Sequence, residues 1–171
     1  MRDLARRYLP DLVFGANDGI ITTFAVVSGV VGASLSNRVI LILGFANLLA
    51  DGVSMGASNY LARRSEGEAA EDPARRLVAR NAVATFFGFV VAGIIPLAAY
   101  LLPLPHGSRY GVALGLTLSS LFLVGASRSL VRDRPFLRSG VEMLLIGSVA
   151  AGIAYGIGAL AADLTADGTG P

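Results

Sequence analysis

Apolar residues form five long segments along the chain, with only short polar stretches between them. They cover about residues 12–35, 38–62, 80–102, 110–131 and 138–162. A hydrocarbon layer about 30 Å thick requires about 20 apolar residues for one helical crossing, and each segment meets that length. The pattern therefore predicts an all-α membrane protein with five transmembrane helices, which together form a single transmembrane domain over residues 1–171.

The composition supports this class of fold. Hydrophobic residues make up 54% of the chain and charged residues 15%, and the mean hydropathy is +0.65. Soluble domains carry about 25% charged residues, so an ordinary soluble fold is excluded. The chain contains no cysteine, which also excludes disulfides and thiolate metal sites.

The distribution of arginine predicts how the helices are oriented. All 14 basic residues are arginine, and twelve of them lie in residues 2–7, 63–80 and 128–138. Only Arg38 and Arg109 lie at the connectors that would face the other side. Short cytoplasmic loops are enriched in arginine, so we predict a cytoplasmic N-terminus and an external C-terminus.

The ten residues before the first apolar segment are too short to cross a membrane. Arginines alternate there with Leu4, Tyr8 and Leu9, which is typical of a short helix lying at the membrane surface. The alternative interpretation of residues 1–10 is a disordered tail.

Charged side chains at membrane depth are rare and are by default functional candidates. Asp18 lies well inside the first segment, and Asp11 and Thr22 fall on the same helical face. We expect Asp11 to mark the cytoplasmic mouth of a path that leads to Asp18. The alternative for Asp18 is a structural hydrogen bond to a neighbouring helix.

The second segment carries a comparable polar face. Asn47, Asp51, Met55 and Asn59 follow one another at four-residue steps, so they form a slowly drifting stripe on one side of a helix. The alternatives are that Met55 faces lipid or the core and that Asp51 is only structural.

Glu142 is the remaining intramembrane candidate, and it opens the fifth segment directly before Met143. A pairing of Glu142 with Arg138 is as plausible as a role as a metal ligand. Carboxylate, amide and thioether groups together favour Fe²⁺ or a similar transition metal over Mg²⁺.

Glycine pairs at four-residue spacing predict where helices approach closely. Gly15 and Gly19 flank Asp18, and Gly52 and Gly56 flank Met55. We expect these two pairs to bring the polar faces close enough to share one ion. For the pairs 111/115 and 152/156 we expect ordinary packing within the bundle.

Four stretches of the sequence resemble the vacuolar iron transporter family, in order and over nearly the whole chain. They are DLVFGANDGIITTFAVVSGVVGA (11–33), LADGVSMGASNYL (49–61), FFGFVVAGIIPLAAYLL (86–102) and SGVEMLLIGSVAAGIAYGIG (139–158). The NDG-x-x-T-T run and the later S-M pair are the most specific parts of this resemblance.

The resemblance implies a five-helix protomer that forms a homodimer with the ion path between the copies. It implies export of Fe²⁺, or of Mn²⁺, from the cytosol in exchange for protons. Asp18 and Met55 match the aspartate and methionine that line the path in that family. Asp11 matches an acidic position at its entrance, and Glu142 matches a recurrent glutamate at the start of the last helix.

Two features depart from the family pattern. The connector between the second and third segments is too short for the cytoplasmic metal-binding domain of the well-known eukaryotic members. Ser58-Asn59-Tyr60 replaces a common G-E-Y sequence, so one carboxylate is missing. Nearby acidic residues are weaker candidates for an entrance site: Glu66, Glu68, Glu71 and Asp72.

These observations give two hypotheses of different classes. The first is a proton-coupled exporter of Fe²⁺ or Mn²⁺ in the cell membrane of a prokaryote, with a second copy, the lipid bilayer and divalent ions as partners. The second is a non-transporting membrane protein that keeps the family fold and binds a partner. We expect no enzymatic activity, because His106, the only histidine, lies in a proline-rich connector with no nucleophile and base pair near it. We also expect no cofactor and no nucleic-acid partner.

Overall fold

The computed structural model describes residues 2–66, 72–130 and 135–167, and within them the chain is all helical. The long helices are α1 (Arg2–Gly32), α2 (Asn37–Ser65), α3 (Asp72–Leu101), α4 (Arg109–Ser127) and α5 (Phe136–Asp167). Two single 3₁₀ turns, η1 (His106–Ser108) and η2 (Arg128–Leu130), flank α4. All five long helices are long and apolar enough to cross a membrane, which confirms the predicted number of spans.

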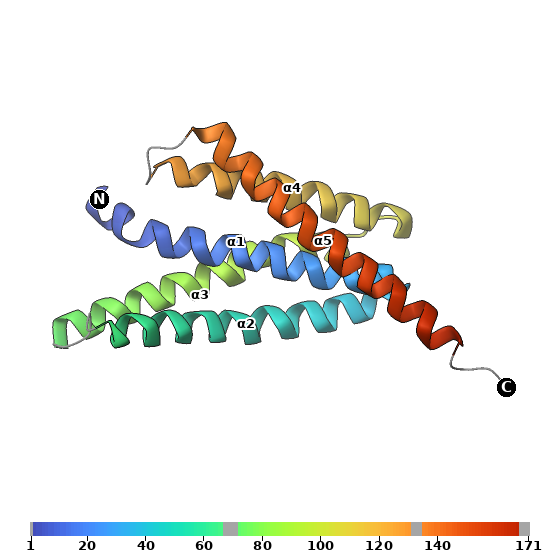
Figure 1. Ribbon diagram of the computed structural model, residues 1–171, viewed down its shortest axis with the longest axis horizontal. Coiled ribbons are helices and arrows are strands. Elements are labelled where there is room, and N and C mark those ends of the chain that lie inside the picture. The colour runs from blue at the N-terminus through green and yellow to red at the C-terminus, as the bar shows by residue number, and fades with distance from the viewer. Residues whose placement is uncertain (1, 67–71, 131–134, 168–171) are drawn as a thin grey trace.

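The helices are arranged around α1. Figure 1 shows α1 in the middle of the bundle, with α2 and α3 on one side of it and α4 and α5 on the other. The start of α1, the end of α2, the start of α3, the end of α4 and the start of α5 lie at one end, and α5 ends at the opposite end. The predicted arginine clusters therefore share one end of the molecule.

Two helices begin earlier than the apolar pattern predicts. Residues 2–10 are not a separate segment but the first turns of α1, with Pro10 inside the helix. α3 begins at Asp72, and its first turns expose Arg75, Arg76 and Arg80. Extending an existing helix is much easier than nucleating one, so both helices continue past the apolar stretch that hydropathy detects.

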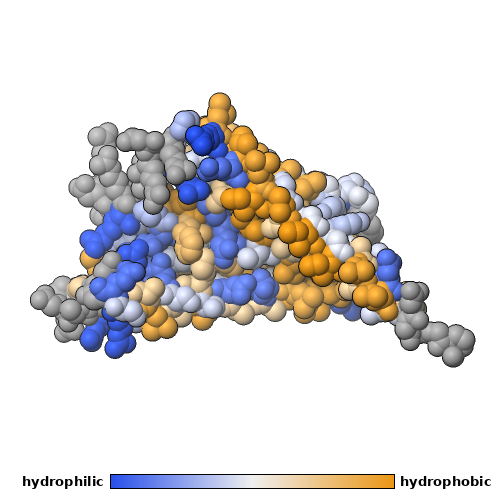
Figure 2. Space-filling model, in the orientation of Figure 1, coloured by the Kyte–Doolittle hydropathy of each residue, from blue (hydrophilic) through white to orange (hydrophobic). Residues whose placement is uncertain are grey.

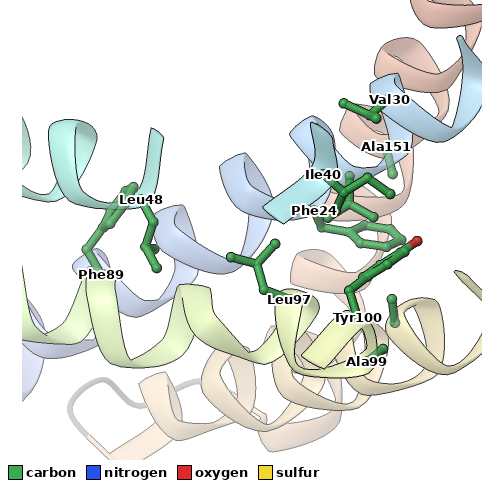
Figure 3. Close-up of a cluster of buried hydrophobic side chains, with 11 residues drawn as sticks. Phe24, Val30, Ile40, Leu48, Phe89, Leu97, Ala99, Tyr100 and Ala151 are labelled. Carbon is green, nitrogen blue, oxygen red and sulfur yellow. The ribbon is translucent and has the colours of Figure 1, made fainter. Parts of the chain in front are cut away.

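Large side chains fill the half of the bundle away from the arginine-rich end. Phe24 of α1, Ile40 and Leu48 of α2, and Phe89 and Leu97 of α3 are all buried in one cluster (Figure 3). In a bilayer, helices associate through packing and close backbone contact, because lipid tails are as apolar as the helix surface. This cluster therefore stabilises the bundle by its shape complementarity.

The glycines around Asp18 serve packing inside one chain. A Cβ at Gly15 would overlap the carbonyl oxygen of Thr85, and a Cβ at Gly19 would overlap that of Phe89. Gly52 and Gly56 of α2 also face α3. The expectation that these pairs bring two polar faces together over one ion is therefore wrong within the protomer, because α3 occupies the space in front of them.

The other two glycine pairs behave in the opposite way. A Cβ at any of the four positions 111, 115, 152 and 156 would meet no atom within 4 Å. Their predicted role in bundle packing is therefore wrong, because no described atom of a neighbouring helix lies against these four positions. Gly32 and Gly158, which the spacing rule did not single out, make the close α1–α5 contact instead.

The outer surface is suited to lipid. α5 exposes large apolar side chains, among them Leu145, Val149, Ile153 and Ile157, and Figure 2 shows the resulting apolar stripe along this helix. Hydrophilic residues gather instead toward the end where the N-terminus lies (Figure 2).

Candidate functional site

Asp18 lies in a crevice between α1 and the ends of α4 and α5. The crevice has a volume of about 370 Å³, and four of its lining residues carry polar groups or sulfur: Asn17, Asp18, Arg128 and Met143. Its apolar walls are Pro10, Val13, Phe14 and Ile21 of α1. Because Pro10 lies near the arginine-rich end and Ile21 deeper in the bundle, the crevice follows α1 for about 16 Å at about 1.5 Å per residue.

The crevice contains three groups that are able to bind a metal ion. Asp18 is half-buried and supplies a carboxylate, and Met143 supplies a thioether. Asn17 is 7% exposed, and its Oδ1 has no hydrogen-bond partner within the described structure. A buried acceptor without a donor is unfavourable, and a bound cation would remove that cost.

Arg128 brings a positive charge into the same crevice. It begins the η2 turn after α4 and is half-buried. A guanidinium near a carboxylate stabilises the charged carboxylate and repels a cation. Arg128 therefore adds a positive charge to the lining of the crevice that contains Asp18.

The polar stripe of α2 approaches α1 at this level. Asp51 lies close enough to Asp18 for the charges of the two carboxylates to interact. Asn47 is half-buried, and its Nδ2 has no hydrogen-bond partner within the described structure. Thr22 instead donates its hydroxyl hydrogen to the backbone carbonyl of Asp18 at 2.8 Å.

Met55 is not part of this crevice. It is half-buried and packs against the main hydrophobic cluster. Within one chain the structure therefore brings Met143, and not Met55, to the crevice of Asp18.

Asp11 is held in a buried polar network rather than at an open mouth. It is 4% exposed, and its Oδ1 accepts hydrogen bonds from Arg63 Nη2 at 2.9 Å and from Asn59 Nδ2 at 3.0 Å. Asn59 Nδ2 also donates to Thr85 Oγ1 at 3.1 Å, and Asn59 Oδ1 accepts from Arg63 Nε at 3.2 Å. This network joins α1, α2 and α3.

The remaining candidates do not line the crevice of Asp18. Glu142 is half-buried on α5 and does not line the crevice. Glu66 is exposed just after α2. Glu68 and Glu71 lie outside the described residues, as does the side chain of Asp72. No group of three or more histidine, cysteine, aspartate or glutamate side chains able to hold a metal occurs in the part of the chain that the structure describes.

Sequence reasoning missed two residues of the crevice. Met143 is one of only three methionines, and it directly follows Glu142, whose carboxylate is the stronger candidate from sequence alone. Arg128 belongs to the arginine bias that predicts orientation, and this bias gives no sign of a position beside Asp18. The available signal was that both residues lie near the same end of the bundle as Asp18.

Comparisons with known proteins agree with the resemblance. A family model described as "VIT family" matches residues 9–80 and 69–159. A vacuolar iron transporter of Toxoplasma gondii is 45% identical over 69 residues, which cover 40% of this chain but only 23% of that relative. Vacuolar iron transporter 1 of Arabidopsis thaliana is 26% identical over 209 positions, which cover 85% of this chain and 82% of the relative. Vacuolar iron transporter homolog 5 of Oryza sativa subsp. japonica is 28% identical over 170 positions, with 91% and 82% covered.

The lengths of these alignments show how the chain differs from some relatives. The alignment with the Arabidopsis protein has 209 positions although it includes only 85% of these 171 residues, so the relative has additional residues inside the aligned region. The alignment with the rice homolog has 170 positions and leaves much less room for such an insertion. The two matches to the family model meet at residues 69–80, beside the short α2–α3 connector.

Proposed function

This chain belongs to the VIT family, whose model matches residues 9–80 and 69–159, and on that premise we propose that it exports Fe²⁺ or Mn²⁺ from the cytosol in exchange for protons. The observation that carries the proposal is the crevice in which the Asp18 carboxylate, the unpartnered Asn17 amide oxygen and the Met143 thioether meet. Oxygen donors with one thioether suit a borderline transition metal better than Mg²⁺.

Each residue of the crevice has a distinct role in this proposal. Asp18 supplies the negative charge that attracts the ion, Asn17 adds a neutral oxygen, and Met143 favours softer ions over harder ones. Arg128 lines the same crevice, so its positive charge opposes tight binding of a cation and assists release. Asp18 binds either a proton or the metal, so the two compete for one group and exchange follows.

A second copy of the chain completes the path in this proposal. Met55 and Asp51 are half-buried on α2 rather than enclosed, so a facing protomer has access to them. Two copies with their α1 and α2 helices facing each other would place both Asp18 side chains near a shared path.

The N-terminal, arginine-rich end lies in the cytoplasm. The chain is an integral membrane protein, and we propose the cell membrane of a prokaryote, although the relatives named above come from plants and a parasite.

Ion flux into liposomes that contain the purified protein tests the proposal. With an imposed pH gradient, we expect flux of Fe²⁺ and Mn²⁺ but not of Mg²⁺. Asp18→Asn should abolish this flux, while Asp163→Asn, which changes an exposed carboxylate near the end of α5, should not. Unchanged Fe²⁺ flux in Asp18→Asn protein would contradict the proposal.

One observation favours the alternative of a non-transporting membrane protein. Asp11, the expected entrance residue, is tied to Arg63 and buried. That alternative predicts no thermal stabilisation of the purified protein by Fe²⁺ or Mn²⁺. Stabilisation by these ions that is lost in Asp18→Asn would exclude it.

A further inference from the structure

A second crevice lies at the arginine-rich end of the molecule, where α1, α2 and α3 meet. Its volume is about 430 Å³. The lining residues come from all three helices: Arg7, Arg63, Ala74, Leu77, Val78 and Asn81. It shares no lining residue with the crevice of Asp18.

One wall of the crevice carries two guanidinium groups, that of Arg7 and that of Arg63, and the second is paired with the Asp11 carboxylate. Arg7 is exposed, and the Arg63 side chain is 29% exposed. The hydrogen bonds from Arg63 to Asp11 and Asn59 fix its guanidinium in place at the wall. No carboxylate of the described residues lines the crevice, and Glu66, which follows α2, is exposed elsewhere.

Asn81 adds an unsatisfied acceptor to the same crevice. The residue is 6% exposed, and its Oδ1 has no hydrogen-bond partner within the described chain. Buried polar atoms are almost always partnered, so this oxygen points to a ligand that brings its own N–H or O–H donor.

The remaining wall is apolar and belongs to the start of the candidate membrane span of α3. Ala74, Leu77 and Val78 belong to the turns in which α3 changes from exposed arginines to its apolar span. A ligand in this crevice therefore meets guanidinium groups and an amide oxygen on one side and hydrocarbon on the other.

We propose that this crevice binds a phosphate ester that carries a hydroxyl group, supplied by the headgroup of an anionic phospholipid such as phosphatidylglycerol. Guanidinium groups bind phosphate oxygens through charge-assisted hydrogen bonds, and basic pockets between transmembrane helices are known sites for anionic headgroups. Asn81 accepts the hydrogen bond of the headgroup hydroxyl, and Leu77 and Val78 contact the carbon chain. The bound lipid then joins the ends of α1, α2 and α3.

Lipid titration of the delipidated full chain tests this proposal, with binding read by native mass spectrometry and by thermal stabilisation. Arg7→Gln should weaken phosphatidylglycerol binding about fivefold to tenfold. Arg76→Gln is the matched control, because it removes the same charge from an exposed position of α3 that does not line the crevice. Both side chains are exposed, so we expect both variants to fold, and their melting temperatures without lipid provide the check.

A second variant tests the hydroxyl contact separately. Asn81→Leu removes the unsatisfied oxygen while keeping the volume of the side chain, so it should reduce the preference for phosphatidylglycerol over phosphatidic acid, whose headgroup has no alcohol. Phosphatidylcholine should bind weakly to every variant.

Three results would overturn the proposal. Equal weakening in Arg7→Gln and Arg76→Gln would show only a general attraction between arginines and anionic lipid. Unchanged phosphatidylglycerol binding in Arg7→Gln would show that this crevice is not the lipid-binding site. Soluble glycerol 3-phosphate that binds as tightly as phosphatidylglycerol, with the same dependence on Arg7, would assign the site to a soluble ester instead of a lipid.

Discussion

Single residues decide how the carboxylates of this bundle are used. Asp11 and Asp18 lie on the same helix, yet Asp11 accepts hydrogen bonds from Arg63 and Asn59, whereas Asp18 lies half-buried in a crevice with Arg128 and Met143. A carboxylate that already pairs with a guanidinium attracts a second cation weakly. The two aspartates are therefore suited to different tasks, structural pairing for Asp11 and ion binding for Asp18.

The choice between the two intramembrane methionines gives a prediction at this scale. Met143→Leu keeps the volume but removes the sulfur donor, so Fe²⁺ flux should fall severalfold relative to Mn²⁺ flux. Met55→Leu is the comparison variant, because Met55 packs against the hydrophobic cluster within one chain and could reach the path only through the proposed dimer. Competition between the two ions in proteoliposomes measures the ratio. A larger change in Met55→Leu would assign the sulfur ligand to Met55.

The Asp11–Arg63 pair gives a prediction on stability. Removal of one partner leaves the other charge partly buried, so Asp11→Asn or Arg63→Gln should lower the free energy of unfolding by about 1–2 kcal/mol, since Arg63 retains some exposure. The double variant should lose less than the sum of the two. Thermal or denaturant unfolding in detergent measures the free energy of unfolding of the wild type, the two single variants and the double variant. Strictly additive losses in the double variant would show that Asp11 and Arg63 have no coupling energy.

At the scale of helices, α1 is fixed to α3 by contact between their backbones. Gly15 and Gly19 lie against the carbonyl oxygens of Thr85 and Phe89, and Gly88 of α3 lies against that of Leu12. These contacts leave no space for a side chain. The position of Asp18, between two of these glycines in sequence, is therefore set by α3 rather than by α2.

This contact predicts which glycines tolerate substitution. Gly19→Val should separate α1 from α3 and lower both folded yield and thermal stability, because its Cβ would overlap the backbone of α3. Gly152→Val places the same side chain on an open face of α5 and should be tolerated. Size-exclusion chromatography and melting temperature compare the two. Similar behaviour of both variants would contradict the assigned packing.

The helices show what the sequence was able to predict. Hydropathy located all five spans, because the thickness of the bilayer sets a length that apolar runs must match. The sequence could not show which helix each glycine pair contacts. A four-residue spacing of glycines shows only that one face of a helix has no side chains, not which helix packs against that face. Met143 was missed for the same reason, because its proximity to Asp18 depends on the packing of α5 beside α1.

At the scale of the whole molecule, the proposed dimer is open to a direct test. The chain has no native cysteine, so a single introduced cysteine reports one position only. Ser54→Cys, exposed on the polar side of α2, should form disulfide-linked dimers in membranes, whereas Leu145→Cys on the apolar stripe of α5 should not. Crosslinking of the α5 variant alone would place the contact between copies on the other face.

The odd number of crossings limits how two copies could ever be joined. α1 begins at one end of the bundle and α5 ends at the other, so a second copy fused directly after the first would be inserted upside down. Such a tandem would place its two Asp18 residues in opposed orientations, unlike two separate chains related by an axis along the membrane normal. Gene duplication with fusion would preserve a path between two parallel copies only if an extra transmembrane helix were inserted between them. An engineered single-chain dimer, in which Asp18 is inactivated in one copy, needs the same additional helix.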